Sequence, residues 1–332
     1  MAGEPLLSVV VPCFNEEAVL PELHRRLTAA CRQCAGESYE LVVVNDASID
    51  NTWARIVSLA QCDPRVVGLC LSRNHGHQLA LTAGLSQCVG QRILVIDADL
   101  QDPPELLPEM MALMDEGADV VYGTRLFRDG ETWFKKAAAT AFYRLLHAVT
   151  EVDIPRDTGD FRLMNRKVAD VLNAMPERHR FIRGMVAWIG FRQVSLPYVR
   201  HQRYAGTTKY PLRKMLRLAA DAITAFSCVP LSASLYVSAV SILLAGLAMV
   251  YTLYSWLFLE AVSGWASMMV VMLTFAAVQM FFLGVLGEYV GRIYFQTSNR
   301  PLFIIDRIVR GAGKNSPAAH RVRRRIGERA PR

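Results

Sequence analysis

Two long uncharged stretches near the carboxyl end most constrain what this chain can fold into. They cover residues 222–259 and 261–287, and Glu260 alone separates them. A helix needs about 20 consecutive apolar residues to cross the hydrocarbon core of a bilayer, and each stretch exceeds that length. We therefore expect an integral membrane protein with a large polar amino-terminal part.

The two stretches are predicted to form a helical hairpin. Residues 262–265 (Val-Ser-Gly-Trp) supply a turn and an interfacial aromatic side chain, and Lys and Arg are absent between Arg217 and Arg292. Basic residues crowd the outer flanks instead: Arg213, Lys214 and Arg217 precede the first stretch, and Arg292, Arg300, Arg307 and Arg310 follow the second. The positive-inside rule then places both termini in the cytoplasm.

Composition limits the rest of the chain. With 332 residues and 52% apolar content, it can form one soluble domain of roughly two hundred residues beside the hairpin. The net charge of +7 gathers near the membrane stretches and in residues 321–325, which suits anionic lipid better than nucleic acid; a solvated tail is the alternative for residues 321–325. The seven cysteines, Cys31 and Cys34 included, form no metal-ligand array, so we interpret them as reduced cytosolic thiols. No cleavable signal peptide is evident.

Short apolar runs bounded by polar turns recur in the amino-terminal part. These runs cover residues 7–11, 41–44, 66–71, 93–96 and 120–122. Helix-like stretches lie between them, with helix starts marked at residues 48–50 and 103–105. The alternation predicts an α/β fold with a mostly parallel sheet covered on both faces. In such folds, ligands bind at the carboxyl ends of the strands.

Polar and acidic residues follow three of the predicted strands, at residues 12–17, 45–48 and 97–102. The chain has neither a dinucleotide-binding glycine motif nor a phosphate loop, which argues against the enzyme classes that use them. Asp97 and Asp99 stand two apart, so an extended backbone would direct both carboxylates to one side, where they could bind a divalent ion that bridges a diphosphate. A surface turn is the alternative for such a pair.

Several motifs together resemble an inverting GT-A glycosyltransferase. They are Val-Pro-Cys-Phe-Asn-Glu-Glu at residues 11–17, Val-Asn-Asp-Ala-Ser at 44–48, Ser-Arg-Asn-His-Gly at 72–76 and Asp-Ala-Asp-Leu-Gln-Asp-Pro-Pro at 97–104. More narrowly, the chain resembles the polyprenyl-phosphate glycosyltransferases of glycosyltransferase family 2. Residues 158–164 and 286–292 and the two-span tail are similar to the bacterial bactoprenol glucosyltransferases of the GtrB type, a resemblance that extends from Leu7 to about Pro301.

The resemblance implies roles for individual residues. The positions that hold the uridine and ribose of a sugar nucleotide are matched by Pro12, Asn15, Glu17 and Asp46. The positions for a divalent metal, Mg²⁺ or Mn²⁺, and the donor diphosphate are matched by Asp97, Asp99 and Gln101. Arg125 matches a donor-binding position, and the acceptor phosphate is assigned to Arg162, Arg203 and Lys209. Asp160 matches the acidic residue proposed as catalytic base.

We expect Asp160 to orient a substrate more than to abstract a proton. A phosphate monoester acceptor has a second pKa of about 6, so it is already largely ionised at neutral pH. Asp160 would then orient the acceptor or the sugar. Because Thr158 and Gly159 precede it, a turn position is the alternative.

Two further sets of residues have a structural interpretation. Asp46, Ser48 and Asp50 could serve only in turns and helix caps, which we favour for Asp50. His75 and His77 flank Gly76 in a predicted loop, and we assign them no catalytic role.

The sequence therefore predicts a metal-dependent enzyme of the bacterial inner membrane whose catalytic domain faces the cytoplasm. It would transfer one hexose, expected to be glucose, from a UDP-sugar to undecaprenyl phosphate with inversion. A dolichol-phosphate-mannose-type or aminoarabinose-type transferase is the alternative within the family, and a non-catalytic membrane scaffold is the alternative outside it. The expected partners are the donor, the lipid acceptor, the bilayer and further copies of the chain in a homo-oligomer, without nucleic acid.

The chain is predicted to divide into four parts. Residues 1–208 form the GT-A catalytic domain, which includes an amphipathic interfacial segment at about 131–150. Residues 209–230 form a juxtamembrane amphipathic helix, 231–293 form two transmembrane helices, and 294–332 form a basic cytoplasmic tail.

Overall fold

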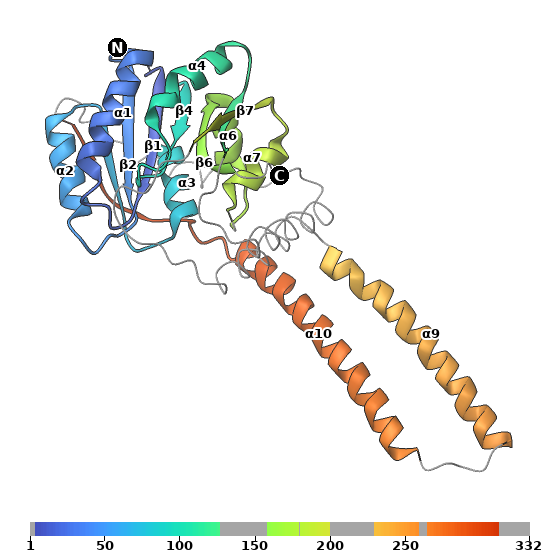
Figure 1. Ribbon diagram of the computed structural model, residues 1–332. Helices are drawn as coiled ribbons and strands as arrows, with labels where there is room; N and C mark the ends of the chain where they lie inside the picture. The colour runs from blue at the N-terminus through green and yellow to red at the C-terminus, as the bar shows by residue number, and fades with distance from the viewer. Residues whose placement is uncertain (1–3, 127–157, 179, 200–228, 259–263, 312–332) are drawn as a thin grey trace, which may run out of the picture.

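An eight-stranded sheet forms the centre of the globular part (Figure 1). The computed structural model describes residues 4–126, 158–178, 180–199, 229–258 and 264–311. The strands are β1 (Leu7–Cys13), β2 (Tyr39–Asn45), β3 (Val66–Leu71), β4 (Arg92–Val95), β5 (Val120–Arg125), β6 (Thr158–Asn165), β7 (Gln193–Tyr198) and β8 (Ile305–Arg310). Their order is β7-β5-β6-β4-β1-β2-β3-β8, and only β6 and β8 run antiparallel to their neighbours.

Helices cover both faces of this sheet. One face carries α1 (Leu20–Ala35), α2 (Thr52–Cys62), the short 3-10 helix η1 (Pro104–Leu106) and α4 (Leu107–Asp115); the other carries α3 (His77–Gln87), α6 (Arg166–Ala174) and α7 (Ile182–Ile189). Successive strand residues serve opposite faces, as Val9 and Val11 pack under the first layer and Val10 under the second. All five predicted strands and the predicted α/β class are confirmed.

Strand β8 lies inside the segment predicted as a basic tail. It pairs antiparallel with β3, from Leu71 opposite Ile305 to Val67 opposite Arg310. Val309 packs on one layer of the core and Ile305 on the other, while Arg307 lies between them in the strand. Residues 305–310 therefore belong to the sheet, and the charges within the strand hid its short apolar pattern from sequence reasoning.

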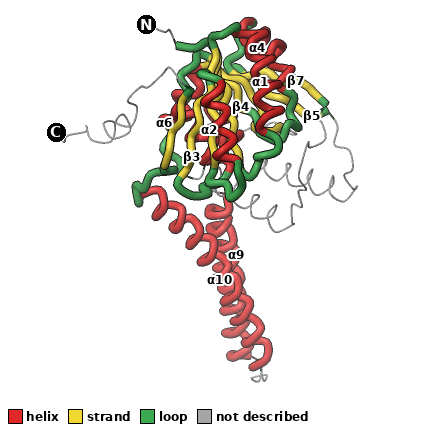
Figure 2. Tube along the Cα trace, turned by 90° about the vertical axis from the view of Figure 1, so that its left-hand side faces the viewer, coloured by secondary structure: helices red, strands yellow, loops and turns green. Residues whose placement is uncertain are grey.

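Two long helices, α9 (Val229–Phe258) and α10 (Trp265–Thr297), form a hairpin that projects away from the sheet (Figures 1 and 2). Within them, Leu231–Tyr251 and Val271–Thr297 have mean hydropathies of 2.1 and 1.7, so both are long and apolar enough to cross a membrane. The predicted interfacial segment at about 131–150 lies outside the described residues, as does the predicted juxtamembrane helix at 209–230 except for Val229 and Pro230, which begin α9.

The hairpin joins the globular part at the carboxyl edge of the parallel strands. Gln296, in the last turn of α10, donates to the Pro176 carbonyl at 2.7 Å and accepts from the Arg178 amide at 3.2 Å. The Ser72 amide, just after β3, donates to the Ile304 carbonyl at 3.0 Å. This is the edge at which ligands of parallel α/β folds bind.

Candidate active site at the carboxyl edge of the sheet

The turns after three neighbouring strands share an uncommon backbone conformation. Asn15 after β1, Ala47 after β2 and Leu100 after β4 have positive φ angles of 58°, 53° and 57°. Non-glycine residues seldom adopt this left-handed region, and they do so mainly where the surrounding structure enforces it, often at functional sites. The strained turns therefore mark this edge as the site.

The turns after β1 and β2 are joined by their own polar groups. The Ile49 amide donates to Asn15 Oδ1 at 3.0 Å, and the Asn51 amide donates to Glu17 Oε2 at 2.9 Å. Pro12 lies in β1 opposite Val44. Pro12, Asn15 and Glu17, all predicted to bind nucleotide, thus lie in the same region. Asn15 and Glu17 also stabilise the turn after β2.

Asp46 is buried directly after β2. Its two carboxylate oxygens accept from the backbone amides of His75 and Gly76 at 2.7 and 2.9 Å. Asp46 therefore ties the turn after β3 to the turn after β2. Asp50 accepts from the Thr52 amide at 3.0 Å, at the start of α2, as its favoured turn role requires.

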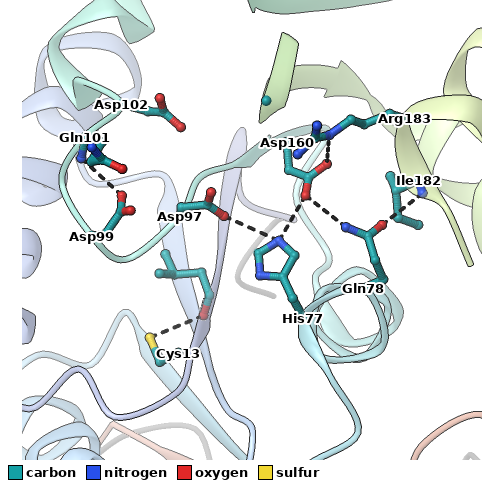
Figure 3. Close-up of polar contacts among 12 residues, drawn as sticks. Cys13, His77, Gln78, Asp97, Asp99, Gln101, Asp102, Asp160, Ile182 and Arg183 are labelled. Carbon is teal, nitrogen blue, oxygen red and sulfur yellow. Dashed lines mark hydrogen bonds and ion pairs between the residues drawn. The ribbon is translucent and has the colours of Figure 1, made fainter. Parts of the chain in front are cut away.

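Asp97 and Asp99 do not extend from one strand, so that premise of the metal prediction is wrong. Strand β4 ends at Val95, and both carboxylates lie in the turn that follows. Figure 3 shows the Asp97 carboxylate directed toward His77, whereas that of Asp99 lies beside Gln101, whose amide donates to it at 3.2 Å. Within the described ranges, no group of three His, Cys, Asp or Glu side chains is arranged to hold a metal ion.

The electrostatic environment of Asp97 nevertheless favours a bound cation. Burial and the negative charges of Asp160, Asp102 and Asp99 raise its pKa to about 6, while His77 opposes the rise. Its Oδ1 is buried without a hydrogen bond, 3.4 Å from His77 Nε2. Excess negative charge and an unsatisfied oxygen are what a divalent cation would relieve.

Asp160 lies in strand β6, which excludes the alternative of a turn residue. It is 2% exposed, and its Oδ2 is 2.9 Å from both His77 Nε2 and Gln78 Nε2, while Arg183 Nε donates to Oδ1 at 2.9 Å (Figure 3). Burial opposes its ionisation, but Arg183, His77 and Arg162 together hold the pKa of Asp160 far below its usual range. Asp160 is thus a fixed anion at neutral pH.

The predicted basic residues occupy different environments. Arg162 is 3% exposed and donates to the carbonyls of Gly159 and Asp160, so it supports the backbone of β6 and is not presented to an incoming phosphate. Arg125, at the end of β5, is 3.9 Å from Asp102 and covers Gly159, where an added Cβ would meet its guanidinium at 2.6 Å. Arg203 and Lys209 lie outside the described residues.

The structure adds three residues to the site that sequence reasoning missed: His77, Gln78 and Arg183. His77 and Gln78 begin α3 directly after Gly76, whose φ of 91° sets the turn at the end of β3. Their position in the turn region after a predicted strand could have identified both as candidate site residues. Arg183 comes from α7, distant in sequence, and had no such signal. Burial opposes protonation of His77, yet its bond to Asp160 and the charge of Asp97 raise its pKa.

An open, mostly parallel sheet with acidic turns at its carboxyl edge defines an α/β enzyme of the GT-A type. Residues 8–172 match the glycosyl transferase family 2. The chain is 48% identical to an uncharacterized glycosyltransferase, YkcC, of Bacillus subtilis (strain 168), over 90% of this chain and 93% of the relative. The chain belongs to glycosyltransferase family 2, and the predicted enzyme class is confirmed.

Two further relatives confirm the narrower resemblance. The chain is 38% identical to a prophage bactoprenol glucosyl transferase homolog of Escherichia coli (strain K12), over 91% of this chain and 99% of the relative. It is also 38% identical to the bactoprenol glucosyl transferase of Shigella phage SfII, over 92% and 99%.

A solved structure shows a distant likeness. Glucosyl-3-phosphoglycerate synthase from Mycobacterium tuberculosis, in complex with Mn²⁺ and UDP-glucose, has a TM-score of 0.42 and 20% identity. The match covers 66% of this chain and 77% of that protein.

Proposed function

We propose that this enzyme transfers a single glucose from UDP-glucose to undecaprenyl phosphate with inversion at the anomeric carbon. The observation that carries the proposal is the extent of the similarity to the bactoprenol glucosyl transferases. It spans 91% of this chain, the hairpin as well as the catalytic sheet, and 99% of the Escherichia coli relative. A shared donor fold alone would not involve the hairpin.

The position of the site supports a lipid acceptor. The carboxyl edge that bears Asp97 and Asp160 is the edge to which α10 returns, through Gln296 and Ile304. We propose that α9 and α10 cross the bacterial inner membrane with both termini in the cytoplasm, as the flanking basic residues indicate. A phosphate at the membrane surface would then approach the edge that holds the acidic turns. We also propose that the chain associates with further copies of itself in a homo-oligomer.

A divalent cation, Mg²⁺ or Mn²⁺, fits the residues at Asp97. Its buried oxygen without a hydrogen bond and its raised pKa both favour a cation, and Asp99 and Gln101 in the same turn would complete the set after a change of side-chain direction. When bound, the ion would neutralise charge on the leaving diphosphate. Arg125, 3.9 Å from Asp102 in the same turn, would add a second positive charge in the donor-binding role proposed for it.

Asp160 is proposed to orient substrate. Its pKa is held far below neutrality, and His77, Gln78 and Arg183 already occupy its two oxygens, so it is a poor proton acceptor. The acceptor phosphate, with a second pKa of about 6, does not need a strong base. The acceptor phosphate is assigned to Arg203 and Lys209, while Arg162 holds Asp160 in place.

Transfer of radiolabelled sugar from a panel of UDP- and GDP-sugars to undecaprenyl phosphate, in detergent with and without Mg²⁺ or Mn²⁺, tests the proposal. We expect metal-dependent labelling from UDP-glucose that is lost in Asp99→Ala. Labelling from another donor would support the mannose-type or aminoarabinose-type alternative. Absence of transfer from every donor, by folded protein, would refute the proposal and support a non-catalytic role.

Asp160→Asn separates catalysis from binding. We expect it to abolish transfer and to leave UDP binding intact, because Asp160 lies apart from the turns that hold the nucleotide. Retained UDP binding also shows that the variant is folded, although Arg162 and Arg183 lose a counter-charge, a change that costs about 3–5 kcal/mol when a buried pair is broken. Equal loss of binding and transfer would contradict this division of roles.

A further inference from the structure

The first turn of α7 rests directly on Asp160. Gln78 on α3 donates through Nε2 to Asp160 Oδ2 at 2.9 Å, and its Oε1 accepts from the Ile182 amide at 2.9 Å. Figure 3 shows Gln78 between these two residues. One side chain thus satisfies an amide at the start of α7 and an oxygen of the catalytic carboxylate, so neither can move without the other.

The same turn supplies a permanent positive charge in contact with Asp160. Arg183 Nε is 2.9 Å from Oδ1, whereas the guanidinium of the buried Arg162 is 3.8 Å away. The Arg183 side chain is 33% exposed, while Asp160 is almost fully enclosed. Arg183 is therefore a partly exposed cation in direct contact with this carboxylate, and His77 contacts its other oxygen.

The segment before α7 is anchored to the membrane hairpin. Arg180 is buried and donates to the carbonyls of Leu172 and Met175, both at 2.6 Å, which fixes the approach to α7. Residues 176–178 within that approach contact Gln296 of α10. A continuous series of contacts thus leads from the end of α10 to the first turn of α7 and on to Asp160.

We propose that Gln78 and Arg183 are positioning residues for the transfer reaction, which hold Asp160 at the orientation set by the first turn of α7 and, through residues 176–178, by the end of α10. The inference rests on the proposed function, because the reaction it serves is the proposed transfer. It also gives a reason for the hairpin to contact the catalytic domain here. The acceptor would enter from the membrane, and the position of Asp160, which orients it, would be set through contacts with the end of α10.

The kinetic test uses Arg183→Ala in the full-length protein. Because a displacement of about 1 Å at a catalytic group can cost a hundredfold in rate, we expect kcat to fall about a hundredfold while KM for UDP-glucose changes less than about threefold. Added guanidinium should restore part of the lost rate, because it can occupy the space left beside Asp160. Arg192→Ala is the matched control: Arg192 donates to the Glu116 carbonyl away from the site, and its loss should leave kcat unchanged.

Hydrogen exchange gives a second test that needs no turnover. Gln78→Ala removes the acceptor of the Ile182 amide, so exchange in residues 182–185 should accelerate at least tenfold, with the strands of the sheet unchanged. Wild-type kcat in Arg183→Ala, or a loss of kcat accompanied by an equal loss of UDP binding and no rescue by guanidinium, would overturn the inference. Unchanged exchange at Ile182 would overturn it as well. Wild-type transfer, measured first in the same assay, tests the proposed function separately.

Discussion

Gly311 is expected to be intolerant of even one added carbon. A Cβ at this position would lie 2.2 Å from Pro64 Cα, 2.7 Å from the Asp63 carbonyl oxygen and 2.9 Å from that of Ala60. All three are backbone atoms, from the last turn of α2 and the connection to β3, so no side chain can turn away to admit it. In Gly311→Ala, the end of β8 must therefore retreat by about 1 Å.

The retreat has a calculable cost. It breaks the hydrogen bond from the Gly311 amide to the Val66 carbonyl, 3.3 Å long, and loosens Val309, which packs beside Gly68 and Ile56. Overpacking costs about 1–3 kcal/mol and a lost backbone hydrogen bond about 1 kcal/mol, so β8 should be destabilised by about 2–4 kcal/mol. Its opening equilibrium would rise about 30- to 1,000-fold.

Hydrogen exchange followed by mass spectrometry on the detergent-solubilised protein measures this directly. Peptides that contain β8 and β3 should exchange faster in Gly311→Ala by that factor, with β1 and β2 unaffected. Gly291→Ala on α10 serves as control, because nothing lies within 4 Å of its added Cβ. Wild-type protection of residues 305–310 in Gly311→Ala would refute the reasoning from close backbone contact.

Three further substitutions test other parts of the structure by thermal unfolding. Burial opposes the ionisation of Asp63, but hydrogen bonds from Arg65 prevail and lower its pKa, so its stabilisation is present at neutral pH and lost as pH falls through that lowered value; Asp63→Asn should cost about 2 kcal/mol at pH 7 and progressively less as the pH falls through the lowered pKa. Ser8→Ala leaves the buried Gly90 amide, which donates to Ser8 Oγ at 2.7 Å, without its acceptor and should cost about 1–3 kcal/mol at any pH. Asp97→Asn should raise the melting temperature in chelator above pH 6, because the raised pKa of Asp97 means that its charge destabilises the fold there, and should abolish metal-dependent transfer. A lowered melting temperature would contradict the charge argument at Asp97.

The buried parallel strands were predictable because each is a short, nearly continuous apolar run. Val9, Val10 and Val11 face alternate layers yet are all fully buried, so the local pattern alone identifies the strand. Strand β8 had no such pattern, since Asp306 and Arg307 interrupt it. Its formation depends on the partner strand β3 and on the close approach of Gly311 to Pro64, and both of these partners are distant in sequence.

The part of the site formed by residues that follow the predicted strands could be predicted from the sequence. Asp46 and Asp97 lie at one edge because the parallel topology brings the ends of β2 and β4 together, and Asp160 reaches the same edge near the start of the antiparallel strand β6. The direction of the Asp97 and Asp99 side chains was not predictable, since it depends on where β4 stops and on the left-handed Leu100 between Asp99 and Gln101. Arg183 could not be found because only the packing of α7 against β6 brings it to Asp160.

The return of the chain to the sheet through β8 has a consequence for biogenesis. On the ribosome, β3 is made long before β8, and until β8 arrives its free edge is open to pairing with any other strand. If α9 and α10 cross the bilayer as proposed, β8 reaches β3 only when both helices have inserted, because a chain with one span would leave β8 on the far side. Completion of the sheet would then occur only in correctly inserted chains, and those with the wrong topology would retain an exposed strand edge that quality-control proteases and chaperones can recognise.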